Sequence, residues 1–146
     1  MNDESTKKDG LSILTRLEIE DLEKKVQFFK TRWNTSLAFH EYGDPNGRPI
    51  FYYHGTGSHI NGMLLHKPAL KFGFRIIAPD RPGVAQSDFR SGWTLLEYAQ
   101  DLADLADHLG IGSFGAIGIS GGGPTLMASA FAIPNRLDCV VDLACA

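Results

Sequence analysis

The chain has 146 residues, of which 43% are hydrophobic and 21% charged, and its formal net charge is −3. This length and apolar content indicate one globular domain whose core needs no disulfide or metal for stability. The negative net charge excludes the basic field that nucleic acids or anionic membranes attract, so we expect neither as a partner.

We expect no targeting segment in the N-terminal stretch, because it lacks the apolar core of a signal peptide. Residues 1–10 are polar and charged, and we predict that they form a disordered tail. No apolar run approaches the roughly 20 residues that a membrane helix requires, so a cytoplasmic location is expected. Cys139 and Cys145 share one face of an apparent strand, too far apart along it to bridge, and are predicted to be reduced, buried thiols.

Residues 11–25 are predicted to form an amphipathic helix. Leucines recur there at near-helical spacing, at Leu11, Leu14, Leu17 and Leu22. Such a helix either lies on the domain or docks a partner, and the sequence leaves both interpretations open.

Two runs rich in β-forming residues follow, at 26–31 and 35–43, and their short connection predicts an antiparallel hairpin. An aromatic, buried-looking strand then ends at His54-Gly55. We predict next a helix over about 62–71 and a buried strand over 74–80, which Arg81-Pro82-Gly83 ends.

The clearest helix covers residues 95–109. Thr94 and Glu97 form a Thr-x-x-Glu capping box at its start, and Gly110 ends it. Its polar face carries Asp101, Asp104 and His108. We expect this face to be solvated, opposite the leucine stripe, rather than to bind a metal.

The last third of the chain continues the alternation of strands and helices. A strand over 114–119 precedes a helix over about 121–132, and a final strand covers 136–146. This order predicts an α/β fold: a mostly parallel sheet with helices on both faces and an antiparallel hairpin at its start.

A possible catalytic motif lies between that strand and helix, at Gly118-Ile119-Ser120-Gly121-Gly122. In G-x-S-x-G a sharp strand-to-helix turn lifts the serine hydroxyl above the sheet edge, and the flanking glycines, Gly118 and Gly122, leave room for the crowded backbones. Ser120 is therefore the candidate nucleophile, and the Gly121 amide is a candidate oxyanion-hole donor.

Three glycines after Ser120 also invite a phosphate-binding interpretation. A phosphate loop requires a Gly-Lys-Ser/Thr sequence, but the last lysine of this chain is Lys71. The dinucleotide fingerprint fails because Ser120 replaces its middle glycine. The histidines His54, His59 and His66 match no common metal-site spacing. We therefore predict no cofactor and no metal.

Three motifs in order, His54-Gly55, Asp80 to Ser87, and Gly118 to Gly122, make the chain similar to the α/β-hydrolase fold superfamily over residues 26–146. The resemblance implies that Thr56 supplies the second oxyanion-hole amide and that His54 supports that loop. One departure is Ala85, where the family usually has glycine.

The residue at the turn indicates the chemistry. Relatives that open epoxides or displace halide resemble this pattern but carry aspartate at the nucleophile position. Ser120 instead favours the esterase-like and aminopeptidase-like branch, in which an ester, thioester or amide substrate forms an acyl-enzyme.

The resemblance also implies an acid and a histidine base after the nucleophile, yet all five histidines precede Ser120. We weigh His54 as a surrogate base and Asp142 as a surrogate acid, and favour neither. The simplest interpretation is a hydrolase fold truncated after about the sixth strand. The alternative is a catalytically silent fragment or interaction module, whose exposed edge strand at 137–146 self-associates or binds a complementing chain.

Overall fold

The computed structural model describes residues 14–143, so the predicted tail at 1–10 and Cys145 lie outside the described part of the chain. Six strands form one sheet in the order β1-β2-β4-β3-β5-β6. The strands are β1 (Gln27–Lys30), β2 (Ser36–Gly43), β3 (Arg48–Tyr53), β4 (Phe74–Pro79), β5 (Phe114–Ile119) and β6 (Leu137–Leu143). The helices are α1 (Arg16–Glu23), α2 (Ile60–Met63), α3 (His66–Phe72), α4 (Leu95–His108) and α5 (Gly123–Ala132).

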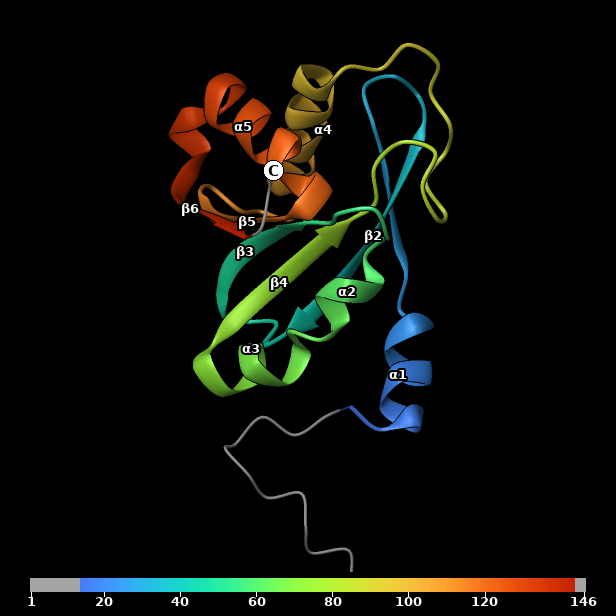
Figure 1. The fold of residues 1–146 in the computed structure, drawn as a ribbon, viewed down its shortest axis with the longest axis vertical. Helices are drawn as coiled ribbons and strands as arrows, with labels where there is room; N and C mark the ends of the chain where they lie inside the picture. Colours follow the sequence, from blue (N-terminus) through green and yellow to red (C-terminus); the bar gives the residue numbers. More distant parts are fainter. Residues whose placement is uncertain (1–13, 144–146) are drawn as a thin grey trace, which may run out of the picture.

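The sheet is mixed, as the sequence predicts. β1 and β2 form the antiparallel hairpin, and β2 also runs antiparallel to β4. The pairs β3–β4, β3–β5 and β5–β6 are parallel. Helices α4 and α5 cover one face of the sheet, while α2 and α3 lie on the other (Figure 1). The α/β architecture with helices on both faces is therefore confirmed.

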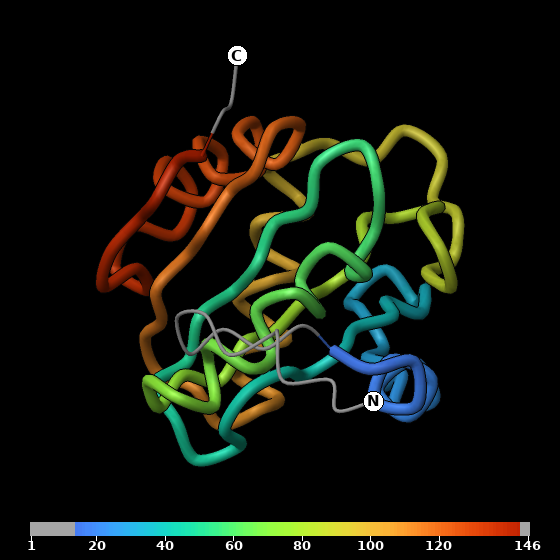
Figure 2. The backbone as a smooth tube through the Cα atoms, turned by 60° about the horizontal axis from the view of Figure 1, so that its bottom comes forward, coloured from blue at the N-terminus to red at the C-terminus, as the bar shows by residue number. Residues whose placement is uncertain are grey.

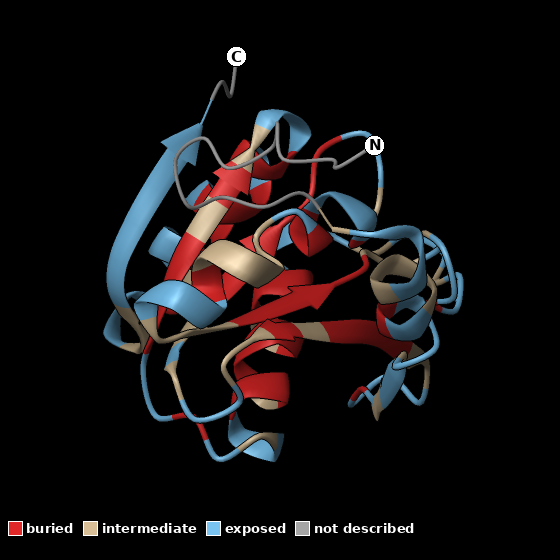
Figure 3. Cartoon of the chain, turned by 90° about the horizontal axis from the view of Figure 1, so that it is seen from below, coloured by how far each residue is buried: buried red, intermediate tan, exposed pale blue. Residues whose placement is uncertain are grey.

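Alternate residues of the central strands supply the two apolar cores. Phe51 and Tyr53 of β3 pack with Leu102 of α4 on one face. Tyr52 of β3 packs with Met63 of α2 on the other. This two-residue alternation is the pleat of a strand buried on both sides, and the central strands are the most deeply buried part of the molecule (Figure 3).

Helix α1 is shorter than the predicted helix at 11–25 and presents a different face. Thr15 caps it, because its hydroxyl accepts from the Glu18 amide while the Glu18 carboxylate accepts from the Thr15 amide. Leu22 is buried, but Leu17 is 77% exposed, so the predicted leucine stripe is wrong at that position. The capping box at Thr15-x-x-Glu18 was the signal in the sequence for where this helix begins.

The single helix predicted at 62–71 is also wrong, because the structure has two short helices there, α2 and α3. Pro68 explains the break. A continuous helix would place Pro68 in its interior, where it lacks the N–H that the fourth preceding carbonyl needs. Restarting at His66 puts the proline in a first turn, where no such N–H is required.

Two side-chain environments differ from expectation. Asp101 is fully buried rather than solvated, and its Oδ2 accepts from Arg90 Nη1 at 2.9 Å. Burial raises the pKa of Asp101, and the Arg90 charge opposes that rise. Cys139 is exposed rather than buried, because β6 is the last strand of the sheet.

The turn after β4 contains Ala85, the alanine at the position where the family usually has glycine. Its backbone φ is 47°, in the left-handed region that glycine adopts without strain, and Gly83 has a φ of 78°. The turn is closed by Ser87, whose hydroxyl donates to the Asp80 carbonyl at 2.9 Å and accepts from the Ala38 amide at 2.9 Å. The alanine is therefore held in a strained conformation by its surroundings.

We expect Ala85→Gly to stabilise the protein by up to about 1 kcal/mol, because relief of the left-handed strain exceeds the entropy that glycine adds to the unfolded chain. The matched control is Ala130→Gly, on an exposed position of α5, which should destabilise by about 1 kcal/mol. Urea unfolding measures both. Equal destabilisation by the two substitutions would contradict the account of the turn.

Candidate active site

Ser120 stands at the carboxyl end of β5, where the strand turns into a helix. Its φ is 51°, so it is one of three non-glycine residues with positive φ in the described chain. A single 3₁₀ turn, Ser120–Gly122, leads directly into α5. The residue is exposed. A strained serine at a strand-to-helix junction, open to solvent, is the geometry that the G-x-S-x-G pattern requires.

Close backbone packing requires glycine at Gly118 and Gly122, on either side of Ser120. A Cβ on Gly122 would fall on the carbonyl oxygen of Tyr53, the last residue of β3. A Cβ on Gly118 would lie 3.1 Å from the Gly122 carbonyl oxygen. No side chain fits at either position without moving backbone, so the strand and the helix can approach only because both residues are glycine.

The loop after β3 lies against this turn (Figure 2). A Cβ on Gly55 would lie 3.2 Å from the Ser120 Cβ and 3.0 Å from the Ile119 carbonyl oxygen. A Cβ on Gly121 would lie 3.7 Å from the Thr56 amide nitrogen. The two backbone amides that the sequence nominates as oxyanion donors, those of Thr56 and Gly121, therefore belong to segments in direct contact beside Ser120.

His54 is buried beneath this loop, and both of its ring nitrogens are engaged. The Arg81 backbone amide donates to Nε2 at 3.1 Å, so Nε2 is an unprotonated acceptor. Nδ1 lies 3.0 Å from the Gly55 carbonyl oxygen and carries the proton. Burial, followed by the nearby Arg81 charge, lowers the pKa of His54. A neutral histidine with both nitrogens occupied supports the loop and has no nitrogen available as a base for Ser120.

Asp80 organises the other side of the loop. Its Oδ1 accepts from the His59 backbone amide at 2.8 Å, and its Oδ2 lies 2.6 Å from His59 Nδ1. The His59 ring stacks on His40 of β2, with centroids 3.8 Å apart. Because Asp80 is fully buried at the end of β4, these bonds attach the β3 loop to the sheet.

The remaining histidines have partners elsewhere in the fold. His66 Nδ1 accepts from the Gly43 amide at 3.0 Å, and the His108 ring lies 5.3 Å from that of Phe29. Asp142 lies within β6 opposite Gly118, on an exposed strand. Every histidine of the chain therefore has a partner other than Ser120, and Asp142 is a strand residue rather than a loop acid.

Arg81, like Asp80 and His59, is a residue beside the site that sequence reasoning did not select. Its guanidinium donates to backbone carbonyls of both the β3 loop and the Ser120 turn, including Gly121 at 2.9 Å. The only signal in the sequence was a cationic residue directly after the motif aspartate, Asp80. A contact between an arginine and carbonyls 26 to 40 positions away leaves no local pattern.

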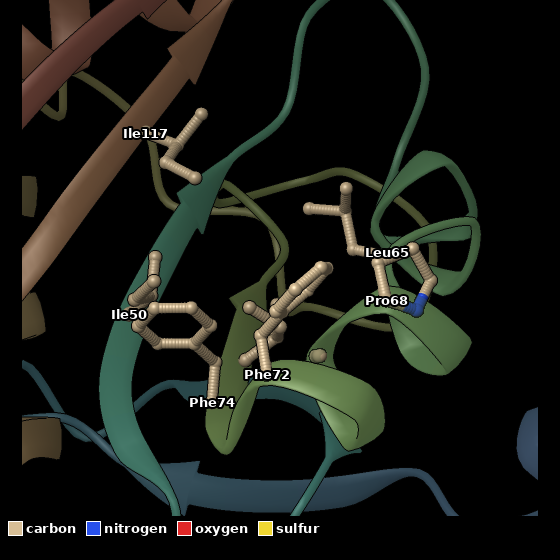
Figure 4. A pocket seen from close by; sticks show the side chains of 8 residues that line it. Ile50, Leu65, Pro68, Phe72, Phe74 and Ile117 are labelled. Carbon is tan, nitrogen blue, oxygen red and sulfur yellow. The ribbon is translucent and has the colours of Figure 1, made fainter. Parts of the chain in front are cut away.

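The described residues also contain an apolar pocket of about 210 Å³ between α3 and the sheet (Figure 4). Its lining residues are Ile50, Leu65, Pro68, Ala69, Phe72, Phe74, Ile76 and Ile117. None of them can act as nucleophile, acid or base. Across residues 14–143, no group of three or more His, Cys, Asp or Glu side chains is placed to hold a metal ion. The same part of the chain has no helix long and apolar enough to span a bilayer.

Residues 62–144 match the family model described as the alpha/beta hydrolase fold. The chain belongs to the α/β-hydrolase fold family. Its described fold agrees with solved members: it superposes on a hydrolase from Pseudomonas aeruginosa with a TM-score of 0.70 and 25% identity, covering 79% of this chain and 44% of that one. An esterase from Thermogutta terrifontis gives a TM-score of 0.69 and 28% identity, covering 80% and 44%.

Curated relatives of this α/β-hydrolase chain are similar at comparable levels. An uncharacterised hydrolase of Bacillus subtilis is 33% identical over 92 residues, which are 63% of this chain and 32% of the relative. Haloalkane dehalogenase 2 of Mycobacterium tuberculosis is 33% identical over 119 residues, 77% and 41% of the respective chains. The chain thus spans 32% and 41% of the length of these two curated relatives.

The protonation of His54 gives a pH prediction. Because its pKa is lowered in the folded state, the unfolded chain takes up the proton first as pH falls below about 6.5. The free energy of unfolding should therefore fall between about pH 6.5 and pH 5, while the raised pKa of Asp101 acts with the opposite sign. Burial lowers the pKa of His40 and of His66 as well, with the same sign as for His54.

Urea unfolding across that pH range measures the slope, and NMR of the His54 ring identifies its neutral Nδ1–H tautomer. We expect His54→Gln to reduce the slope and Ser91→Ala, which changes a non-titrating residue on an exposed position, to leave it unchanged. A His54 ring that becomes charged near pH 6.5, or a slope unaffected by His54→Gln, would contradict the assignment.

Proposed function

We propose that this chain carries the nucleophile and oxyanion-binding part of a serine hydrolase acting on an ester, thioester or amide. The observation that supports it best is Ser120 itself: an exposed serine with a φ of 51° at the end of β5. The adjacent contact of Gly55 with the Ser120 Cβ brings a second amide-bearing loop to the same point. Family membership supports hydrolysis in general, and the serine favours acyl chemistry.

In the proposed reaction a base takes the Ser120 hydroxyl proton while Oγ forms a bond to the substrate carbonyl carbon. The carbonyl electron pair moves to oxygen, where the Thr56 and Gly121 amides donate to it. Collapse breaks the bond to the leaving group, which receives the proton and departs. Water then repeats the sequence on the acyl-enzyme and frees the acid.

A serine at this position disfavours halide displacement, the reaction named for the Mycobacterium relative. Attack of a serine oxygen on a saturated carbon would give an ether, which has no carbonyl for water to attack. Attack on an acyl carbon gives an ester, which water can hydrolyse. The nucleophile therefore favours acyl substrates on chemical grounds.

The base and acid of this reaction are proposed to come from residues other than those described. The five histidines have partners apart from Ser120, and His54 is held neutral with both nitrogens engaged. We therefore expect turnover of a p-nitrophenyl ester by the purified chain to fall below about 1 per second, the lower end of the ordinary enzyme range.

Added imidazole tests whether only the base is lacking. With p-nitrophenyl acetate, imidazole should promote acylation of Ser120 in a concentration-dependent way, detected by mass spectrometry of the Ser120 peptide. Ser120→Ala should abolish that adduct, whereas Ser91→Ala, in an exposed loop, should leave it unchanged. Acylation that is absent from Ser120, or no greater there than at Ser91, would refute the proposal.

A second candidate function is an interaction module that uses the edge of the sheet. β6 is the last strand in the sheet order, and Val140 and Val141 on it are 50% and 41% exposed. Figure 3 shows this strand as an exposed ribbon beside the buried centre of the sheet. An apolar edge strand offers unpaired backbone groups to another strand. We propose self-association of the chain through this edge, centred on Val140 and Val141.

Size-exclusion chromatography with light scattering measures this association. We expect concentration-dependent oligomers that Val140→Lys disrupts, because it places a charge on the edge strand. The control is Leu64→Lys, on an exposed residue at the end of α2, which should leave the oligomers intact. A monomer at all concentrations would contradict self-association, and binding of β6 only to an added, different chain would replace it with the complementing-chain alternative.

A further inference from the structure

Arg81 connects the two backbone segments that flank the candidate active site. The residue follows Asp80 at the end of β4, outside both segments. Its Nη1 donates to the His54 carbonyl at 3.2 Å and to the Gly121 carbonyl at 2.9 Å, and its Nη2 donates to the Gly55 carbonyl at 2.6 Å. One guanidinium therefore holds the loop after β3 and the turn after β5 at the same time.

The hydrogen bond from Arg81 to the Gly55 carbonyl also determines the direction of the Thr56 N–H. The Gly55 carbonyl and the Thr56 N–H belong to one planar peptide unit, and the described chain has no cis peptide bond. In a trans peptide these two groups point in opposite directions. The Gly55 oxygen accepts both from Arg81 Nη2 and from His54 Nδ1. With that oxygen fixed from two sides, the Thr56 N–H is aimed the opposite way.

Arg81 also fixes the orientation of His54, which likewise donates to the Gly55 carbonyl. Its backbone amide donates to His54 Nε2 at 3.1 Å, which keeps the proton on Nδ1, where it can reach the Gly55 carbonyl. Arg81 therefore controls the Gly55 peptide directly through its side chain and indirectly through its main chain.

The hydrogen bond from Arg81 to the Gly121 carbonyl sets the spacing between the loop after β3 and the turn after β5. Gly121 lies beside Thr56, since a Cβ on Gly121 would lie 3.7 Å from the Thr56 nitrogen. Arg81 binds Gly121 through the same Nη1 that binds the loop carbonyl of His54. A planar guanidinium presents several donors in a fixed geometry, whereas a lysine ammonium is a single point donor on a flexible stem. Lysine could not replace these contacts with the same geometry.

We propose that Arg81 is a positioning residue of the oxyanion hole, which sets the direction of the Thr56 N–H and its separation from the Gly121 N–H. This inference rests on the proposed function, because it assigns Arg81 a role in preparing those two amides for a substrate oxygen. Arg81 acts through the backbone and does not itself contact the reacting atoms. Preorganised donors accelerate acyl transfer because they need no rearrangement as the oxyanion forms.

The first test measures direction without requiring activity. Residual dipolar couplings report the orientation of each backbone N–H, so they are measured for the native chain and for Arg81→Ala and Arg81→Lys. We expect the Thr56 coupling to change in both variants while those of β3 and β5 stay the same. Methylguanidinium added to Arg81→Ala should restore the native Thr56 coupling. An unchanged Thr56 coupling in Arg81→Ala would overturn the proposal.

The second test measures the effect on chemistry. The imidazole-dependent acylation of Ser120 should fall at least about tenfold in Arg81→Ala and Arg81→Lys, and methylguanidinium should restore part of it in Arg81→Ala. The matched control is Arg32→Ala, which removes an arginine paired with Asp104 at 2.7 Å on the surface, and should not alter the rate. A native acylation rate in Arg81→Ala would overturn the positioning role.

The two proposals can fail separately. If the native chain shows no acylation at Ser120 under imidazole, the proposed function fails, and the dipolar couplings alone decide whether Arg81 orients the loop. If Ser120 is acylated but neither rate nor coupling responds to Arg81→Ala, the hydrolase assignment stands and the role of Arg81 is refuted. Loss of stability without a change in the Thr56 coupling would likewise reduce Arg81 to a structural residue.

Discussion

The candidate site depends on a close contact between two backbones at the carboxyl ends of β3 and β5. Gly122 packs on the Tyr53 carbonyl at a distance that admits no side chain, and a Cβ on Gly55 would lie only 3.2 Å from the Ser120 Cβ. Parallel neighbouring strands bring these ends together, and the glycines allow the following loops to touch. The strained backbone of Ser120 lies at the same contact, where β5 passes through a single 3₁₀ turn into α5.

A second layer of polar contacts holds that arrangement in place. The buried Asp80 carboxylate binds the far end of the β3 loop through His59, while Arg81 binds its near end and the Ser120 turn. Both residues come from the end of β4. The short segment from Asp80 to Ser87 thus anchors its neighbours, and the Ser87 hydroxyl closes the segment by donating to the Asp80 carbonyl. Donors and acceptors that would otherwise be buried without partners are satisfied within this layer.

The sequence predicts most of the fold because its signals there are local. The capping box at Thr94, the strand-breaking turn after Asp80 and the G-x-S-x-G pattern each act within a few residues, and the structure has a helix, a turn and a junction at those places. What it misses depends on tertiary contacts. The burial of Asp101 requires Arg90 from a preceding loop, and the exposure of Cys139 follows from the edge position of β6. Arg81 binds carbonyls from two segments that are distant in the sequence, and such a contact leaves no periodic pattern of residues.

The most direct measurement is a crystal structure of the chain with Ser120 phosphonylated, since the phosphonyl oxygen occupies the position of a substrate oxyanion. The account predicts that this oxygen lies about 2.7–3.1 Å from the Thr56 and Gly121 amide nitrogens, with the Gly55 carbonyl still bound by Arg81. A phosphonyl oxygen turned to solvent, or bound by neither amide, would contradict the claim that these two segments form an oxyanion hole around Ser120.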